Sequence, residues 1–230
     1  MRKFLAVMTA GLALGAMGSA QAQSLRFDGV NPGPMAVDVP INATTPCGTI
    51  GFDFCDVNGD GLLYDLGGGI TVLAQGLAND LAAEIIQDIR GPNQGLGVQS
   101  EGVFSLDQVN VAAGESILFS FSEEVTLRNI EFNDGLGQDC PGGGLEGVCG
   151  LFDLIIDEGL ASEVTLTGLA ALAVVSGGWV GQTFEFIHTS PIDGGFSIAA
   201  LSIPLPAALP IFLTGLGLVA GASRRRKKTA

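Results

Sequence analysis

The stretch ESILFSFSEEVTLRNIEF, residues 115–132, decides the fold class of this 230-residue chain. Apolar side chains recur at every second position from Ile117 to Phe121, which is the period of a half-buried β-strand. The apolar positions of Val125–Leu127 and of Ile130–Phe132 follow opposite phases. A β-bulge near Arg128–Asn129 reconciles the two phases, so the whole stretch is predicted to be extended.

Further strands are expected on both sides of this stretch, separated by turns. Glycine supplies 35 residues and proline 10, about a fifth of the chain, and this composition disfavours a helical bundle. The expected strands are Ile70–Ala74, Leu151–Ile156, Glu163–Leu169, Thr183–His188 and Phe196–Leu201. Short strands with glycine-rich turns predict a mainly β domain, built as an antiparallel, jelly-roll-like β-sandwich.

Residues 1–22 are identified as a secretory signal peptide. Arg2 and Lys3 precede an apolar run of 14 residues that ends at Met17, which is shorter than the roughly 20 residues needed to span a bilayer. The small residues Ala20 and Ala22 fit the positions that signal peptidase recognises. Cleavage is therefore predicted after Ala22, and the protein is expected to be exported.

Residues 203–230 contain three parts that are expected to form a second targeting signal, at the C-terminal end. A proline-containing motif comes first, and an apolar stretch from Ala207 to Ala222 follows it. This stretch is expected to form one hydrophobic transmembrane helix, although 16 residues with Pro210 suit temporary retention better than permanent anchoring. The basic cluster should hold the terminus in the cytoplasm. It consists of Arg224, Arg225, Arg226, Lys227 and Lys228.

This order closely resembles the PEP-CTERM class of bacterial sorting signals, in its VPLPA-CTERM variant. Ile203, Pro204, Leu205, Pro206 and Ala207 stand where that variant has Val-Pro-Leu-Pro-Ala, with one conservative exchange. The resemblance covers the last 28 residues. It implies recognition by an exosortase, removal of the tail, release or attachment at the cell surface, and association with exopolysaccharide or biofilm matrix. An ordinary C-terminal anchor helix with a basic stop is the alternative.

The segment Gln75–Arg90 fits two structures. Leu77, Leu81 and Ile85 recur every four residues, as on one face of a helix. The following GLGV at residues 95–98 loosely resembles ectodomains of other PEP-CTERM proteins, in which a strand pair leads into this turn. A strand at Ala83–Asp88 is therefore favoured, with a short helix as the alternative.

The ectodomain expected after trimming, residues 23–202, is strongly acidic. It contains all 24 acidic residues and three of the ten basic ones, Arg26, Arg90 and Arg128, so its net charge is 3 − 24 = −21 against −14 for the whole chain. This charge disfavours nucleic acid and anionic membranes as partners. Divalent cations and neutral polysaccharides suit it better, while a role in solubility alone explains the charge equally well.

Four cysteines lie in the exported part, which favours disulfides. They are Cys47, Cys55, Cys140 and Cys149. Three pairings are possible, and we favour Cys47 with Cys55 and Cys140 with Cys149 because each pair brackets a short glycine-containing loop. The spacings do not suit zinc.

The segment DVNGDGLLYD, residues 56–65, opens like an EF-hand or dockerin-type calcium loop. Asp56, Asn58 and Asp60 would be ligands, with Gly61 at the turn, but the twelfth position of the loop is a glycine. Asp65 sits two residues earlier and would complete a shorter loop. Two interpretations stay open: a structural calcium site, or a plain acidic turn between strands.

Little in the sequence points to catalysis. The only histidine, His188, follows Phe184 and Phe186 in strand phase, which favours a strand-end residue over a catalytic one. Trp179 is interpreted as a core residue, with a sugar-stacking platform as the alternative. Paired carboxylates occur by chance in so acidic a domain, and none is singled out.

The sequence thus predicts a secreted, non-enzymatic protein of the cell envelope or extracellular matrix. It is expected to be anchored transiently in the inner membrane and then to reach the cell surface or the medium. Its expected partners are signal peptidase and exosortase, and nucleic acid is excluded. The alternative is a calcium-assisted, lectin-like module that binds exopolysaccharide, and a glycan hydrolase ranks third.

Overall fold

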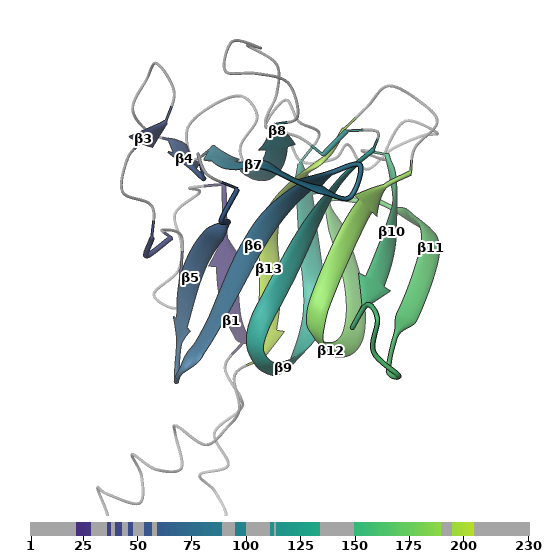
Figure 1. Ribbon diagram of the computed structural model, residues 1–230. Helices are drawn as coiled ribbons and strands as arrows, with labels where there is room; N and C mark the ends of the chain where they lie inside the picture. Colours follow the sequence, from purple (N-terminus) through teal and green to yellow (C-terminus); the bar gives the residue numbers. More distant parts are fainter. Residues whose placement is uncertain are drawn as a thin grey trace, which may run out of the picture. The chain divides into compact units, whose positions relative to one another are not determined.

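The computed structural model in Figure 1 describes residues 22–28, 36–37, 40–42, 46–47, 53–56, 59–88, 95–99, 111–112, 114–133, 150–189 and 195–204. The described strands belong to one compact unit, Gln23–Pro204, apart from the first residue of β1. They are β1 (Ala22–Arg26), β2 (Ala36–Val37), β3 (Pro46–Cys47), β4 (Asp53–Cys55), β5 (Leu62–Gly67), β6 (Ile70–Ala78), β7 (Leu81–Asp88), β8 (Gly95–Gln99), β9 (Glu115–Asn133), β10 (Leu151–Ile156), β11 (Val164–Ala170), β12 (Val174–His188) and β13 (Ser197–Pro204).

The prediction of a mainly β domain is confirmed. Each of the five flanking strands predicted from the sequence overlaps an observed strand, although β12 begins well before the expected Thr183. Within the described residues the structure contains no helix, and so none that is long and apolar enough to cross a membrane. The hydrophobic helix predicted between Ala207 and Ala222 lies outside the described residues.

The strands form one hydrogen-bonded sheet that closes on itself as a barrel. β9 pairs with β6, β6 with β7, β7 with β8, β8 with β13, and β13 pairs back with β9. Beyond this ring, β5 extends the sheet from β6, β4 and β3 extend it from β7, and β12, β10 and β11 extend it from β9. The predicted sandwich of two separate sheets is not confirmed, because the pairing is continuous around the ring.

Two long strands carry this continuity. Figure 1 shows β9 and β12 curving through the lower end of the view, so that each contributes to both sides of the domain. The bend coincides with a register shift, since Ser120 pairs with Thr183 but Val125 pairs with Gly181. The intervening Ser122–Glu124 is exposed at the corner. A strand that passes from one wall to the other cannot belong to two independent sheets.

The alternation that predicted β9 corresponds to burial. Val125 and Leu127 are buried, and Ile130 and Phe132 are buried in the opposite phase. The change of phase occurs where β12 carries an irregularity opposite Arg128. The irregularity lies where the phase changes, but its extra residue belongs to β12, so the predicted bulge in β9 itself is not confirmed.

The ambiguous segment after Gln75 is a β-hairpin. Ala78 of β6 pairs with Leu81 of β7, and Asn79 and Asp80 between them both have positive φ, 51° and 64°. Positive φ at both central residues is the mark of a type I′ turn, which asparagine and aspartate tolerate. The favoured strand is confirmed. A spacing of four is a multiple of two, so it also places side chains on one face of a strand.

Aromatic rings fill the interior. Phe132 lies 5.0 Å from Phe152 and 5.1 Å from Phe196 between ring centroids, and Phe186 lies 5.7 Å from Phe119. All five side chains are fully or almost fully buried. They come from β9, β10, β12 and the residue directly before β13, so the core forms only when strands distant in sequence have paired.

Candidate functional site

The predicted calcium loop begins beside the barrel wall. Asp56 follows β4, its backbone N donates to the carbonyl of Ile85 at 3.1 Å, and its side chain is buried. One carboxylate oxygen of Asp56 accepts a hydrogen bond from the backbone N of Gly61, which has a φ of 89°. Asp56 therefore closes the turn from within, as an acidic turn residue does.

Of the other predicted ligands, the structure describes Asp60 and Asp65. Asp60 is exposed, and Asn58 lies outside the described residues. Asp65 is exposed on β5, where its Oδ1 accepts from the backbone N of Gly67 at 2.8 Å. Because β5 is extended, Asp65 lies about 13 Å along the strand from Gly61. The structure does not bring Asp65 to the turn, so a loop shortened to end at Asp65 is not supported.

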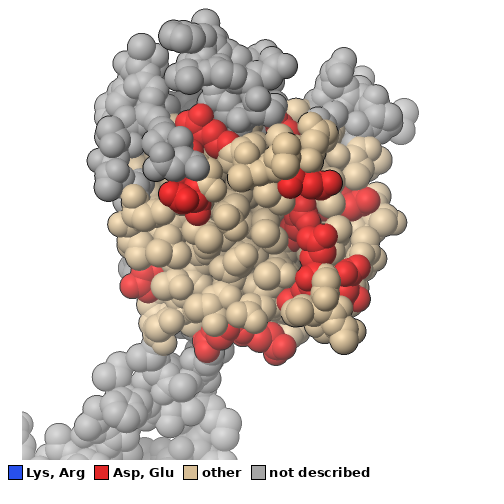
Figure 2. Space-filling model, in the orientation of Figure 1, with Lys and Arg blue, Asp and Glu red and all other residues tan. Residues whose placement is uncertain are grey.

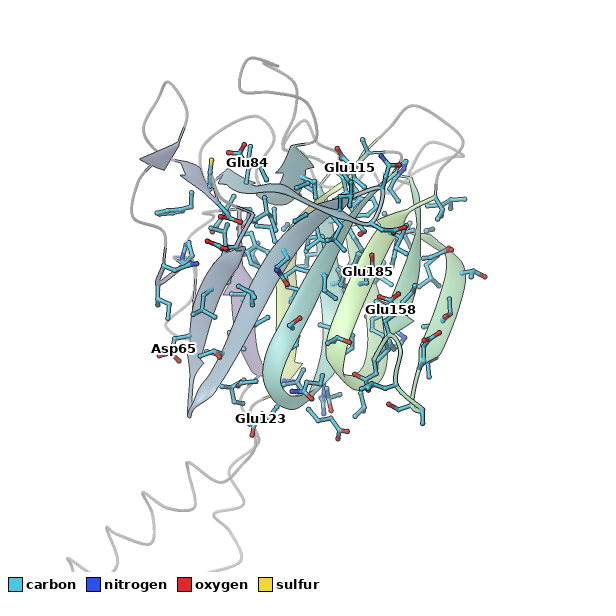
Figure 3. All side chains as sticks on the ribbon, viewed as in Figure 1. Asp65, Glu84, Glu115, Glu123, Glu158 and Glu185 are labelled. Atoms are coloured by element: carbon cyan, nitrogen blue, oxygen red, sulfur yellow. The ribbon has the colours of Figure 1, made fainter. Side chains whose placement is uncertain are left out.

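A residue that the sequence reasoning missed stands next to Asp56. Glu84 belongs to β7 and is half-buried. Burial raises the pKa of Glu84, and the negative charge of Asp56 raises it further. Figure 3 shows Glu84 at the upper edge of the domain, well away from Asp65. A cross-strand neighbour of this kind has no sequence signal, since Glu84 lies far along the chain.

Two carboxylates are not a complete metal site. Among the residues that the structure describes, no three His, Cys, Asp or Glu side chains converge closely enough to hold an ion. Asp56 and Glu84 supply oxygen donors of the type that calcium prefers, but calcium takes six to eight such ligands. The calcium site therefore stays a prediction.

A second acidic cluster, defined here as Asp80, Glu158 and Glu185, lies beside β12. Glu185 is buried and accepts a hydrogen bond from Ser116 Oγ at 2.6 Å. Burial raises the pKa of Glu185, the bond from Ser116 opposes this, and contact with Glu158 and the charge of Asp80 raise it further. Figure 3 shows Glu158 and Glu185 next to each other, and Figure 2 shows acidic patches with no basic side chain on the described part of this face.

Asp157 forms a different kind of acidic site at the end of β10. Its Oδ1 accepts from the backbone N of Gln182 at 2.7 Å and of Thr183 at 3.0 Å, where β12 bends. Burial opposes ionisation, but these bonds and one from Ser162 outweigh it and lower the pKa of Asp157. The Asp157 carboxylate thus links the end of β10 to the bend of β12.

Several exposed apolar side chains were also missed by the sequence reasoning. Five of the seven large hydrophobic side chains exposed in the described residues lie between residues 160 and 180. They are Leu160, Val164, Leu172, Val174 and Val180. The sequence does contain a signal that could have revealed these exposed residues, because no charged residue occurs from 164 to 184 in this otherwise acidic domain.

Trp179 is half-buried and is the cross-strand partner of the buried Leu127 of β9, so it shares the core-facing side of the sheet, and its interpretation as a core residue is not overturned. A Cβ placed on Gly177 would lie 2.5 Å from each of three atoms of the Trp179 ring. Near-equal distances to three ring atoms mean that one face of the indole covers Gly177. His188 is a buried strand-end residue against Phe196, at 5.8 Å between ring centroids, as predicted.

The predicted processing sites fall at the edges of the compact unit. β1 begins at Ala22, and β13 ends at Pro204 after the buried Ile203. Ala20, the remainder of the sorting motif and the basic cluster lie outside the described residues. Cys55 carries no free thiol, and β3, which contains Cys47, pairs with β4. Cys140 and Cys149 lie outside the described residues, so the pairing stays a prediction.

Comparison of the chain with known proteins finds no match among protein-family models, curated proteins or solved structures.

Proposed function

We propose that this protein is an exported, non-enzymatic component of the cell envelope or extracellular matrix whose tail is processed by an exosortase. The observation that carries the proposal is the extent of the compact unit. It runs from Gln23 to Pro204, so the predicted signal peptide ends directly before it, and all but the first two residues of the predicted sorting signal follow it. The N-terminal cut predicted from the sequence falls directly before the first residue of this unit.

Both predicted processing events leave the core complete. Cleavage after Ala22 keeps Leu25 and Phe27, which are fully buried, within the mature chain. Removal of residues after Pro204 keeps all of β13, including Leu201. The packing of the folded unit therefore needs no residue before Gln23 or after Pro204, which supports a role of those flanking residues as removable segments.

The surface charge supports an extracellular role without nucleic acid. The described charged residues are acidic apart from Arg26 and Arg128, and Arg26 is already paired with Asp28 and Glu131 at 2.6 and 3.1 Å. A polyanion would be repelled by this surface. Neutral polymers and cations would not be.

The test is fractionation of the native host with and without its exosortase, followed by mass spectrometry of the C-terminus. We expect a trimmed chain at the surface or in the medium of the wild type. In the exosortase-deficient strain we expect the full tail in the inner-membrane fraction. An intact tail in both strains would contradict the proposal.

A second candidate function is polysaccharide binding, with the domain acting as a lectin-like module. The half-buried Trp179 favours it, because an indole held flat on Gly177, in a segment of the chain without charged residues, is a suitable stacking platform for a neutral sugar. A pull-down with host exopolysaccharide should retain the wild type and lose a Trp179→Ala variant. Retention of both proteins would contradict a role of Trp179, and turnover of the bound polymer would favour the glycan hydrolase.

Calcium is proposed only as a structural aid to this second function. It would be held by Asp56, with Glu84 as an additional ligand. Calorimetric titration of the purified protein with calcium should then release heat, and Glu84→Gln should weaken the binding. No heat and no change in thermal stability would leave the turn as the plain acidic alternative.

A further inference from the structure

The predicted sorting motif overlaps the last strand of the barrel. The motif begins at Ile203, whereas β13 ends at Pro204, so two motif residues are part of the folded unit. Ile203 is 1% exposed, and the preceding Ser202 is still in register with Asn129 of β9. The motif is therefore divided between the barrel and the chain that follows it.

β13 is an interior strand with neighbours on both edges. In the order of the sheet it lies between β8 and β1, and it also pairs with β9 to close the ring. The backbone N of Phe27 donates to the carbonyl of Ala199 at 2.8 Å. An enzyme that cleaves a peptide must reach its backbone and side chains. A buried interior strand offers neither unless it opens locally.

We propose that the barrel gates the processing of its own tail. Ile203 and Pro204 reach the membrane enzyme only when the C-terminal end of β13 separates from its neighbours. This inference rests on the exosortase processing proposed above, and it adds that the local stability of β13 sets the processing rate. If the motif were fully accessible, the rate at which the enzyme processes it would not depend on the stability of the fold.

The sequence provides no spacer that would relieve the overlap. Leu205 and Pro206 alone separate β13 from the apolar run that begins at Ala207. Two extended residues reach about 7 Å. Burial of an isoleucine side chain favours the closed strand end by roughly tenfold to a hundredfold. Processing should be slowed by a similar factor relative to a motif outside the fold.

The test is pulse-chase labelling of the full-length chain in its native host, with the C-terminus identified by mass spectrometry. One variant carries, directly after Pro204, a flexible Gly-Ser-Gly-Gly-Ser-Gly linker followed by Ile-Pro. This leaves β13 unchanged and supplies a complete motif outside it. The control carries the same linker followed by Gly-Ser, so it has the same length but no second motif start. We expect the first variant to be processed about tenfold or more faster than the wild type, and the control no faster.

Equal rates for the wild type and the first variant would overturn the gate. Equally fast processing of both insertions would also overturn it, since spacing from the membrane would then account for the effect. A parallel exosortase-deficient strain separates these results from failure of the proposed function. If the wild-type tail is intact in both strains, the processing proposal itself fails.

Discussion

The two halves of strand β12 share β9 as a neighbour but differ in burial. In Thr183–His188, the side chains of Phe184, Glu185 and Phe186 are buried. In Val174–Gly181, Val174 and Val180 are 51% and 52% exposed. One continuous strand thus contributes to the core at one end and exposes apolar side chains at the other.

The difference follows from the neighbours of each half. β10 pairs with residues 184–188 of β12, so that half lies between two strands and under the aromatic core. In the described part of the chain, the other half pairs with β9 alone. The burial of the side chains in each half of β12 therefore depends on how many strands lie beside that half. The hydrophobicity of the residues themselves does not decide it, since valine is as apolar at an exposed position as at a buried one.

The halves meet at a tightly held bend. The backbone N of Asp157 donates to the carbonyl of Thr183 at 3.0 Å, and its carboxylate accepts from Gln182 and Thr183. A Cβ at Gly181 would lie 2.4 Å from Cγ2 of Ile156, so a larger residue does not fit there. The bend is where the exposed and the buried half can be uncoupled by mutation.

The largest effect is expected in the buried half. Phe186 is fully buried, and its ring lies 5.7 to 6.5 Å from those of Phe119, Phe132 and Phe152. Phe186→Ala should lower the free energy of unfolding by about 3–5 kcal/mol, because it leaves a cavity among these rings. Urea denaturation measures the change. Phe186→Leu is the control and should lose less, whereas equal losses would mean that volume at this position is not what matters.

The next largest effect is expected at the bend. Asp157→Ala should cost about 2–3 kcal/mol, because two backbone donors lose a charged acceptor. Alanine also disfavours the φ of 53° found at this position. Asp157→Asn tolerates this φ and keeps an acceptor oxygen, so it should cost less. A loss confined to the exposed half, seen as faster amide exchange at Val174–Gly181 alone, would contradict the role of the bend as a shared support.

The contribution of Asp157 also has a defined pH dependence. Its pKa is lowered below the ordinary 3.8, so its stabilisation is fully present above that pH and is lost as the pH falls through the lowered pKa. The difference in unfolding free energy between the wild type and Asp157→Asn should therefore shrink below about pH 3.8. A difference that stays constant down to pH 2 would show that ionised Asp157 is not favoured by the fold.

The contribution of Glu185 in the buried half to stability should depend on pH in the opposite direction to that of Asp157, and the effect should be smaller. Its pKa is raised above the ordinary 4.5, so its contribution to stability is present below that pH and is lost as the pH rises through the raised pKa. Glu185→Gln should stabilise the protein at pH 7 by about 0.5–1 kcal/mol, since it removes a like-charge contact with Glu158. Thermal unfolding at pH 7 and pH 4 tests this, because the gain should vanish at pH 4. Glu123→Gln at the exposed corner is the control and should change little.

The smallest effect is expected in the exposed half. Val180→Thr keeps the β-branch on a side chain that is already half in water, so the free energy of unfolding should change by less than about 0.5 kcal/mol. The same exchange at the buried Val72 of β6 is the control and should cost clearly more. A large loss at Val180 would mean that its side is covered in the folded protein.

Much of the fold was predictable because local patterns carry it. The two phases of β9 and the strand at Leu151–Ile156 follow from alternation of apolar side chains, which depends on neighbours in the sequence alone. The predicted sandwich was not confirmed, because the arrangement of a sheet depends on which strands pair. Closure of the ring depends on pairing of β13 with β9, and no local pattern reports which distant strands pair.

The candidate site was predictable only in part for the same reason. The turn from Asp56 to Gly61 is a local motif, and its carboxylate-to-backbone bond is a local contact. Glu84 lies near this turn but belongs to another strand, and Asp65 lies away from the turn because β5 is extended. The clustering of Glu158 with Glu185 likewise requires β10 and β12 to be neighbours.

The sequence by itself determined that this protein is mainly β, where most strands lie, and how acidic the domain is. It also determined where the signal peptide and the C-terminal sorting signal are expected. The tertiary structure alone decided that the sheet closes into a barrel, that Trp179 is incompletely buried, and that Ile203, where the predicted motif begins, is a core residue. Periodicity and charge are properties of adjacent residues. Burial is a property of contacts between residues far apart in the chain, and these exist only after the strands have paired.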